Sequence, residues 1–221
     1  MKHEKLKKIL GVIFIVAAFA AGYSLFVFFY AAGGTQNTSS DMFGWKFPVT
    51  KFPSTGSSGG QVAYSTIRDP NAAPKGLPVR LQIPIIGVDS AVEDALITPD
   101  GKMDVPANST NVAWFALGPI PGAVGSAVIG GHFGIKNNVP FVFYNLDKMK
   151  VGDKIKVIDD EGNTISFIVR IIKSFNQNAD ATTVFTSSDG LAHLNLITCE
   201  GVWNQVNGSY PDRLVVFADK E

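Results

Sequence analysis

Three residues with the chemistry of acyl transfer stand at the ends of apolar runs. Cys199, the only cysteine in the chain, ends the run 194–199 (LNLITC), and His132 ends the run 127–132 (AVIGGH). Arg213 opens another apolar run fourteen residues after the cysteine. A thiolate attacks carbonyl groups, a histidine can take its proton and return it to a leaving amine, and a cation can stabilise the oxyanion. These residue types predict thiol-based acyl transfer if the fold brings them together.

The alternative interpretation is that Cys199 is an unreactive structural residue, because cysteine is among the most buried residue types and often serves only as a small core residue. Cys199 cannot form a disulfide within the chain. In an exported domain, an unused thiol would be a reactive liability. The neighbouring motifs favour the nucleophile over the inert core residue.

The remaining histidines and the acidic residues suit structural roles. His193 lies six residues before the cysteine, about 20 Å away along an extended strand, and His3 lies in the N-terminal tail. One cysteine and two scattered histidines do not make a zinc site, so we expect no metal and no cofactor. We interpret the acidic residues that could suggest a calcium site as solvated loop charges: Glu93, Asp94, Asp159, Asp160 and Glu161.

Short apolar runs separated by turn residues fill the chain from residue 78 onward. The run 164–173 alternates apolar and polar residues and follows the turn sequence DEGN, which is typical of a hairpin. Helical periodicity is limited to 141–149 and 181–187. Many short strands at this spacing predict an all-β sandwich or barrel. The expected strands are 79–85, 88–96, 112–115, 126–131, 154–159, 164–173, 193–198 and 213–218.

The first third of the chain predicts a membrane anchor and a tether. Residues 9–32 are uncharged and apolar, and as a helix they would span about 36 Å, enough to cross a bilayer. The positive-inside rule places the basic tail, residues 1–8, in the cytoplasm. A cleaved signal peptide is the alternative, although its apolar core would run only about 7–15 residues. Residues 33–77, rich in Gly, Ser, Thr and Pro, predict an extracellular linker, in which the aromatic segment 41–53 packs against the membrane or domain edge or forms a lid.

The charge balance argues against nucleic acid as a partner. The chain carries 19 basic and 19 acidic residues, and without its tail it has a net charge of about −3. No basic run resembles a nucleic-acid footprint. We therefore expect partners of another class.

Three motifs, in order along the chain, resemble those of the sortase family. Residues 195–199 (NLITC) resemble its Thr-Leu-x-Thr-Cys signature, and residues 212–218 (DRLVVFA) resemble its arginine strand. Residues 127–132 resemble its histidine strand. The resemblance departs at Asn195, where the signature has threonine, and at Phe133-Gly134, where an aspartate often stands two positions after the histidine.

The resemblance extends over about residues 78–219. Residues 80–88 (RLQIPIIGV) resemble the opening strand of the sortase domain, and residues 114–122 (WFALGPIPG) are most like the class F group. The implied fold is all-β, a closed eight-stranded sortase-type β-barrel with short helices, preceded by one N-terminal transmembrane helix. Residues 78–221 would then be the catalytic domain.

The resemblance implies roles for individual residues. Cys199 would be the nucleophile, His132 the general acid/base and Arg213 the cation that stabilises the oxyanion or orients the substrate. Thr198 matches a family position that lines the substrate groove. The backbone N–H of Glu200 is the expected oxyanion donor. Apart from the resemblance, we interpret Trp114 and Trp203 as core or rim aromatics, with substrate contact as the alternative for Trp203, which follows Cys199 in the next loop.

The implied activity is that of a membrane-anchored cysteine transpeptidase facing outward from the cell membrane. Such an enzyme cuts a Leu-Pro-x-Thr-Gly-like sorting signal of an exported protein between Thr and Gly and holds the acyl group as a thioester on Cys199. It then passes the acyl group to an amine acceptor, either a peptidoglycan precursor or a pilin lysine. Two alternatives remain: a thiol peptidase that releases its product to water, and a non-catalytic sortase-like barrel that binds peptides.

Overall fold

The computed structural model of the protein describes residues 76–221. The predicted tail 1–8, the predicted anchor 9–32 and nearly all of the predicted linker 33–77, with its segment 41–53, lie outside the described residues. Within the described part, no helix is both long and apolar enough to cross a membrane. The anchor and the domain boundaries therefore stay predictions.

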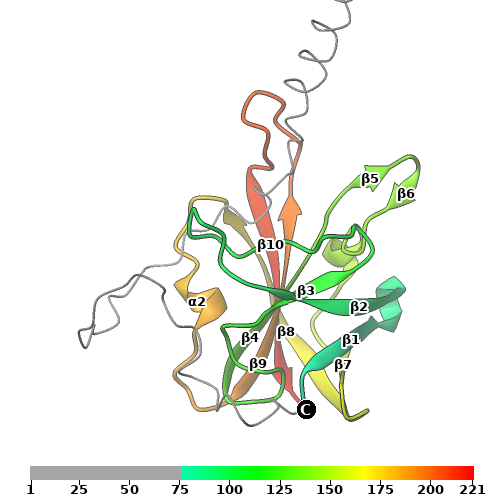
Figure 1. The fold of residues 1–221 in the computed structure, drawn as a ribbon, viewed down its shortest axis with the longest axis vertical. Helices are drawn as coiled ribbons and strands as arrows, with labels where there is room; N and C mark the ends of the chain where they lie inside the picture. The colour runs from blue at the N-terminus through cyan, green and yellow to red at the C-terminus, as the bar shows by residue number, and fades with distance from the viewer. Residues whose placement is uncertain (1–75) are drawn as a thin grey trace, which may run out of the picture. The chain divides into compact units, whose positions relative to one another are not determined.

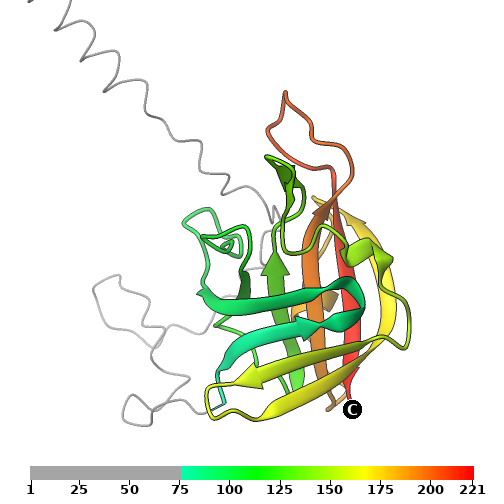
Figure 2. The ribbon, with the colours of Figure 1, turned by 90° about the vertical axis from the view of Figure 1, so that its right-hand side faces the viewer.

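Eight strands close into a barrel (Figures 1 and 2). Around the barrel their order is β1-β2-β3-β4-β9-β10-β8-β7, and β7 pairs with β1 to complete the circle. The strands are β1 (Pro78–Ile83), β2 (Val88–Ala95), β3 (Val112–Phe115), β4 (Gly125–Gly131), β7 (Lys154–Asp159), β8 (Thr164–Asn176), β9 (Ala192–Glu200) and β10 (Asp212–Lys220). The closed eight-stranded barrel implied by the motifs is confirmed.

Two of the strand pairs are parallel, β2 with β3 and β4 with β9. Parallel neighbours need long crossover connections, and the one between β4 and β9 contains β7 and β8. Because β4 and β9 run in the same direction, their last residues meet at one end of the barrel. His132 follows β4 directly, and Cys199 is the second-to-last residue of β9. The topology thus brings together two residues that lie far apart in sequence.

A short hairpin and three short helical segments lie in the connections between the barrel strands. The strands β5 (Ile135–Lys136) and β6 (Val139–Pro140) form a hairpin that the sequence did not predict, with Asn137 and Asn138 in left-handed conformation at its turn. Such conformations suit a two-residue hairpin turn, in which asparagine is favoured. The helical segments are η2 (Pro84–Ile86), η3 (Leu146–Lys148) and α2 (Thr182–Phe185). The two predicted helical stretches thus contain helix, but only as single turns.

Side chains alternate between two cores along each barrel strand. On β9, Leu194 and Leu196 face the barrel interior, where they pack in the same cluster as the fully buried Trp114. Ile197 belongs to a second cluster on the outside of the sheet, together with Val184 of α2. By this alternation, Cys199 lies on the outer face of β9.

The interpretation of five acidic residues as solvated loop charges is wrong for three of them. Glu93 and Asp94 belong to β2, and Glu93 accepts hydrogen bonds from the backbone N–H of Ala107 and the side chain of Asn111. Asp159 is buried and accepts hydrogen bonds from the turn that follows it, including the backbone N–H of Asn163. The hydrogen bond from the Asn163 side chain, together with those from the backbone N–H groups of the turn, holds the pKa of Asp159 below its usual value. Asp159 therefore organises the β7–β8 hairpin.

Candidate active site

Cys199 and Arg213 face each other across two hydrogen-bonded strands. They are directly opposite in the antiparallel register of β9 and β10. Side chains of directly opposed residues lie on the same face of a sheet, with Cβ atoms about 5 Å apart. The thiol and the guanidinium therefore share the outer face of the barrel, at the end from which the β9–β10 loop and the β5–β6 hairpin project (Figure 2).

His132 reaches the same place from the neighbouring strand. The parallel register pairs Gly130 of β4 with Ile197 of β9, and two residues further along each strand stand His132 and Cys199. The Nε2 atom of the histidine lies 2.8 Å from the carbonyl oxygen of Pro106. A carbonyl oxygen only accepts, so Nε2 carries a proton and donates it there. In the neutral ring, Nδ1 is then the nitrogen that can exchange a proton with the thiol.

Arg213 is fully buried, and backbone carbonyl groups hold its side chain. Its Nη1 atom donates to the carbonyl oxygens of Tyr210, at 3.0 Å, and Asp212, at 2.8 Å. Burial lowers the pKa of the guanidinium, whereas the nearby Cys199 and Asp212 raise it. An arginine remains charged in proteins, so a fixed positive charge lies beside the thiol of Cys199.

The thiol of Cys199 is only 1% exposed and sits in a low-dielectric environment. Burial raises its pKa to about 11, although the positive charge of Arg213 opposes the shift. The protonated thiol is therefore the resting form at neutral pH. A thiol in this form needs a base before it can act as a nucleophile, and His132 is a residue of the type that could supply one.

Thr198 and Gly131 join β9, which carries Cys199, to β4, which leads to His132. The Thr198 hydroxyl donates to the carbonyl oxygen of Gly131 at 2.7 Å, and Thr198 itself is buried. A Cβ atom on Gly131 would lie 2.5 Å from the ring of the buried Phe143, so any other residue there would have to displace that ring. The threonine side chain thus secures β4 against β9, directly before His132.

Aromatic side chains connect the loops that surround the site. Phe133 stacks on Tyr144, with 5.9 Å between ring centroids, and meets Tyr210 edge-on at 5.5 Å. Trp203, which is 44% exposed, meets Tyr210 edge-on at 5.1 Å. Gly134 has a φ of 120°, and a Cβ atom there would lie 3.2 Å from the Tyr210 hydroxyl. The positive φ therefore favours glycine at this position, where an aspartate often follows the histidine.

Glu200, the last residue of β9, directly follows Cys199 in the chain, and by strand alternation its side chain lies on the opposite face of the sheet from the thiol. Its Oε2 atom is buried and has no hydrogen-bond partner among residues 76–221. Trp114, in contrast, lies in the barrel core and donates from Nε1 to the carbonyl of Pro119, so it takes no part in the site.

The structure adds two participants that the sequence did not reveal, the Pro106 carbonyl and Tyr210. A backbone carbonyl has no residue signature, and nothing distinguishes Tyr210 from other aromatics before its neighbours are known. His193 lies away from these residues, between Asp189 and Asp219. In the described part of the chain, no group of three or more metal-binding side chains comes together.

Comparisons with known proteins agree on the fold. A sortase A from Corynebacterium diphtheriae aligns with a TM-score of 0.51 at 23% identity, over 67% of this chain and 62% of that one. Its lid mutant aligns with a TM-score of 0.51 at 24% identity, over 69% and 74% of the two chains. Sortase C-1 from Actinomyces oris aligns with a TM-score of 0.50 at 24% identity, over 65% and 74%. No curated protein matches the chain.

Structural likeness at 23–24% identity shows only the fold. Membership of a family is shown by a match to a family model. The model of the sortase domain matches residues 81–221, well over half of the chain. That range includes His132, Cys199 and Arg213. The chain therefore belongs to the sortase family, whose members are cysteine transpeptidases.

Proposed function

We propose that the protein is a membrane-anchored transpeptidase that cleaves a Leu-Pro-x-Thr-Gly-like sorting signal and transfers the acyl group to an amine. The observation that carries the proposal is the register of three strands. It sets Cys199 opposite Arg213 and brings His132 to the same end of the barrel. Nucleophile, proton carrier and fixed cation are the groups that acyl transfer requires.

In the first half of the reaction, Nδ1 of His132 takes the thiol proton as Cys199 attacks the carbonyl carbon of the substrate threonine. The positive charge of Arg213 and the backbone N–H of Glu200 stabilise the negative oxygen that develops. Collapse of this intermediate breaks the Thr–Gly bond, and the histidine returns the proton to the leaving amine. A thioester on Cys199 remains.

In the second half, an amine attacks the thioester and the cysteine leaves as a thiolate, which takes up the proton that the amine loses. A charged Arg213 next to the sulfur stabilises that leaving group. The acceptor is an amine of a peptidoglycan precursor or a pilin lysine. The donor is an exported protein that carries the sorting signal.

Substrate contacts are proposed for three residues. Trp203, half-exposed on the β9–β10 loop, offers an apolar surface to the peptide. Glu200 contributes its backbone N–H. Thr198 acts at the groove through its place beside the nucleophile and through its hydrogen bond to Gly131.

Two finer features of the proposal rest on the sequence. The apolar run 9–32 behind the basic tail 1–8 supports a single-pass anchor, with the N-terminus in the cytoplasm and the catalytic domain outside. Residues 114–122 support a class F relationship.

Product analysis separates the proposal from its two alternatives. The full-length protein in detergent is incubated with a pool of Leu-Pro-x-Thr-Gly peptides, with and without an added amine such as triglycine. We expect cleavage between Thr and Gly and a ligated product whenever the amine is present. A free threonine carboxylate in both reactions would support a thiol peptidase. Peptide binding without any cleavage would support a non-catalytic barrel.

A further inference from the structure

The connection between β8 and β9 crosses the outer face of the sheet beside the nucleophile. It carries α2, whose Val184 packs in one cluster with Ile197 and Val215. Ile197 lies two positions before Cys199 on β9, and Val215 lies two positions after Arg213 on β10. Two positions along a strand keep a side chain on the same face and correspond to about 6.6 Å. The helix α2 therefore packs on the same face of the sheet as the thiol and close to it along the strands.

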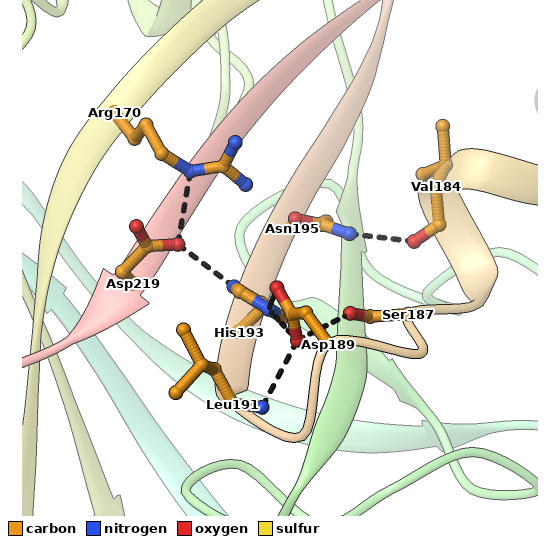
Figure 3. Close-up of polar contacts among 8 residues, drawn as sticks. All are labelled: Arg170, Val184, Ser187, Asp189, Leu191, His193, Asn195 and Asp219. Atoms are coloured by element: carbon orange, nitrogen blue, oxygen red, sulfur yellow. Dashed lines mark hydrogen bonds and ion pairs between the residues drawn. The ribbon is translucent and has the colours of Figure 1, made fainter.

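A single turn of helix does not hold its position alone. Helix formation is cooperative, and helices much shorter than a dozen residues need tertiary contacts. Asn195 of β9 provides one, because its Nδ2 atom donates to the carbonyl oxygen of Val184 at 2.6 Å (Figure 3). Asn195 is buried and shares the outer face with Cys199. It stands where the sortase signature has threonine, whose shorter side chain carries no amide.

A second contact holds the C-terminal end of the same connection. The ring of His193, only 4% exposed, lies between two carboxylates (Figure 3). Its Nδ1 atom is 2.7 Å from Asp219 of β10, and its Nε2 atom is 3.0 Å from both oxygens of Asp189. Asp189 in turn accepts hydrogen bonds from the hydroxyl of Ser187 and the backbone N–H of Leu191. One histidine thereby joins the connection to the end of β10.

Near His193, the connection between β8 and β9 is not packed closely against the sheet. A hollow of about 260 Å³ separates the connection from the sheet beside His193 and Asn195. Its lining includes Thr183 and Ser187 from the connection and Ile171, Lys173, Phe175 and Phe217 from β8 and β10. The two polar contacts therefore add to the apolar packing of Val184 and Phe185 in attaching the connection to the sheet.

The contact made by His193 depends on protonation. Both ring nitrogens face carboxylates, which only accept hydrogen bonds, so both contacts form fully only when both nitrogens carry protons. Burial lowers the pKa of His193, but the hydrogen bonds and charges of Asp189 and Asp219 raise it above its usual value. The other charged groups near the ring are Arg170, which donates to Asp219 at 3.0 Å, and Lys173 on the lining of the hollow.

The direction of the pH effect follows from that raised pKa. A group whose pKa is higher in the folded than in the unfolded state stabilises the fold fully below the unfolded value. The stabilisation is lost as the pH rises through the folded value. The contact is therefore complete in acid and incomplete in alkali.

We propose that Asn195 and His193 are positioning residues that fix α2 as one wall of the acyl-donor site, and that protonation of His193 tightens this wall. The proposal deepens the proposed function and rests on it for its consequence in catalysis. Neither residue touches the reacting atoms. Asn195 acts on the helix itself, and His193 acts on the segment that returns from the helix to β9.

Hydrogen–deuterium exchange tests the attachment without any substrate. In the full-length protein in detergent, the amides of Val184 and Thr186 are protected by α2. At pH 6 we expect their exchange to be about fivefold faster in Asp189→Asn and His193→Gln than in the wild type, the effect of one net hydrogen bond. At pH 8.5, after correction for intrinsic exchange, the difference should shrink. The control is Asp89→Asn, which removes an exposed contact with Arg80 on the far strands β1 and β2. Equal exchange in wild type and both variants at pH 6 would overturn the proposal.

Steady-state kinetics test whether the attachment of α2 affects binding of the donor peptide. We expect Asn195→Ala and Asp189→Asn to raise the KM for the donor peptide about fivefold, with kcat and the alkylation rate of Cys199 within about twofold of wild type. In Asp189→Asn the KM should also lose its rise with pH. A fall in kcat at constant KM would refute the positioning role. If no peptide is processed, the proposed function fails, whereas the exchange experiment still decides whether the attachment exists.

Discussion

Replacing Arg213 by methionine should change the reactivity of the thiol by an amount that the structure sets. Burial raises the pKa of Cys199 to about 11, and Arg213 is the charge that holds it from rising further. At pH 8 about one protein in a thousand therefore carries a thiolate, against roughly a quarter for an ordinary thiol with a pKa near 8.5. An opposite charge within about 4–6 Å typically shifts a pKa by 1–3 units. Arg213→Met should thus reduce the thiolate population at least tenfold.

Alkylation with iodoacetamide, followed by intact-mass spectrometry, measures this population directly. The chain has one cysteine, so every adduct reports Cys199. For the wild type we expect the rate to rise about tenfold per pH unit from pH 7 to 10 without a plateau. For Arg213→Met we expect a parallel line at least tenfold lower. The rate in urea provides the reference for an unhindered thiol.

Arg213→Lys separates the charge from the geometry of the guanidinium. Lysine keeps a positive charge, so alkylation should stay close to the wild-type rate. Two outcomes would refute the reasoning. A plateau below pH 9 in the wild type would show a resting thiolate stabilised by an imidazolium, and an unchanged rate in folded Arg213→Met would show that the arginine does not act on the sulfur.

Three further predictions concern turnover and stability. Arg213→Lys should lose most of its peptide cleavage although its thiol stays reactive, because an ammonium lacks the two-pronged guanidinium; this is checked by initial rates. Gly131→Ala should lower the free energy of unfolding by about 1–3 kcal/mol in urea titrations, because its Cβ would meet the buried Phe143 ring, and adding Phe143→Leu should restore part of the loss. Cys199→Ala should unfold within about 1 kcal/mol of wild type, because the thiol is small, yet show no cleavage; residual cleavage would exclude Cys199 as the nucleophile.

Most of the barrel could be predicted from local sequence because each strand shows its own pattern. The alternation over 164–173 marks β8, and the apolar runs before Cys199 and after Arg213 mark β9 and β10. The boundaries were less accurate. The first strand ends at Ile83 because Pro84 begins a 3₁₀ turn, and β8 continues to Asn176 because β10 pairs with it that far. The β5–β6 hairpin was missed because strands of two residues carry no period.

For the candidate site too, some features could be predicted from the sequence and others could not. Cys199, His132 and Arg213 could be selected as candidates because their residue types and flanking runs are visible in the sequence, and the fold brings them to one end of the barrel. Their supports were not, because a Pro106 carbonyl holds the histidine and two backbone carbonyls hold the arginine. The prediction that His193 is structural fits its position between Asp189 and Asp219, but the carboxylates become its neighbours only through the fold.

The most direct test of the central claim is a search for an acyl group on the nucleophile. The full-length protein is mixed with a pool of Leu-Pro-x-Thr-Gly peptides, quenched in acid and examined by intact-mass spectrometry, with Cys199→Ala as the control. We predict an adduct with the mass of the peptide up to its threonine, present on Cys199, absent from the variant and lost when triglycine is added. Peptide cleavage that persists in Cys199→Ala, or an adduct that maps to another residue, would contradict the account.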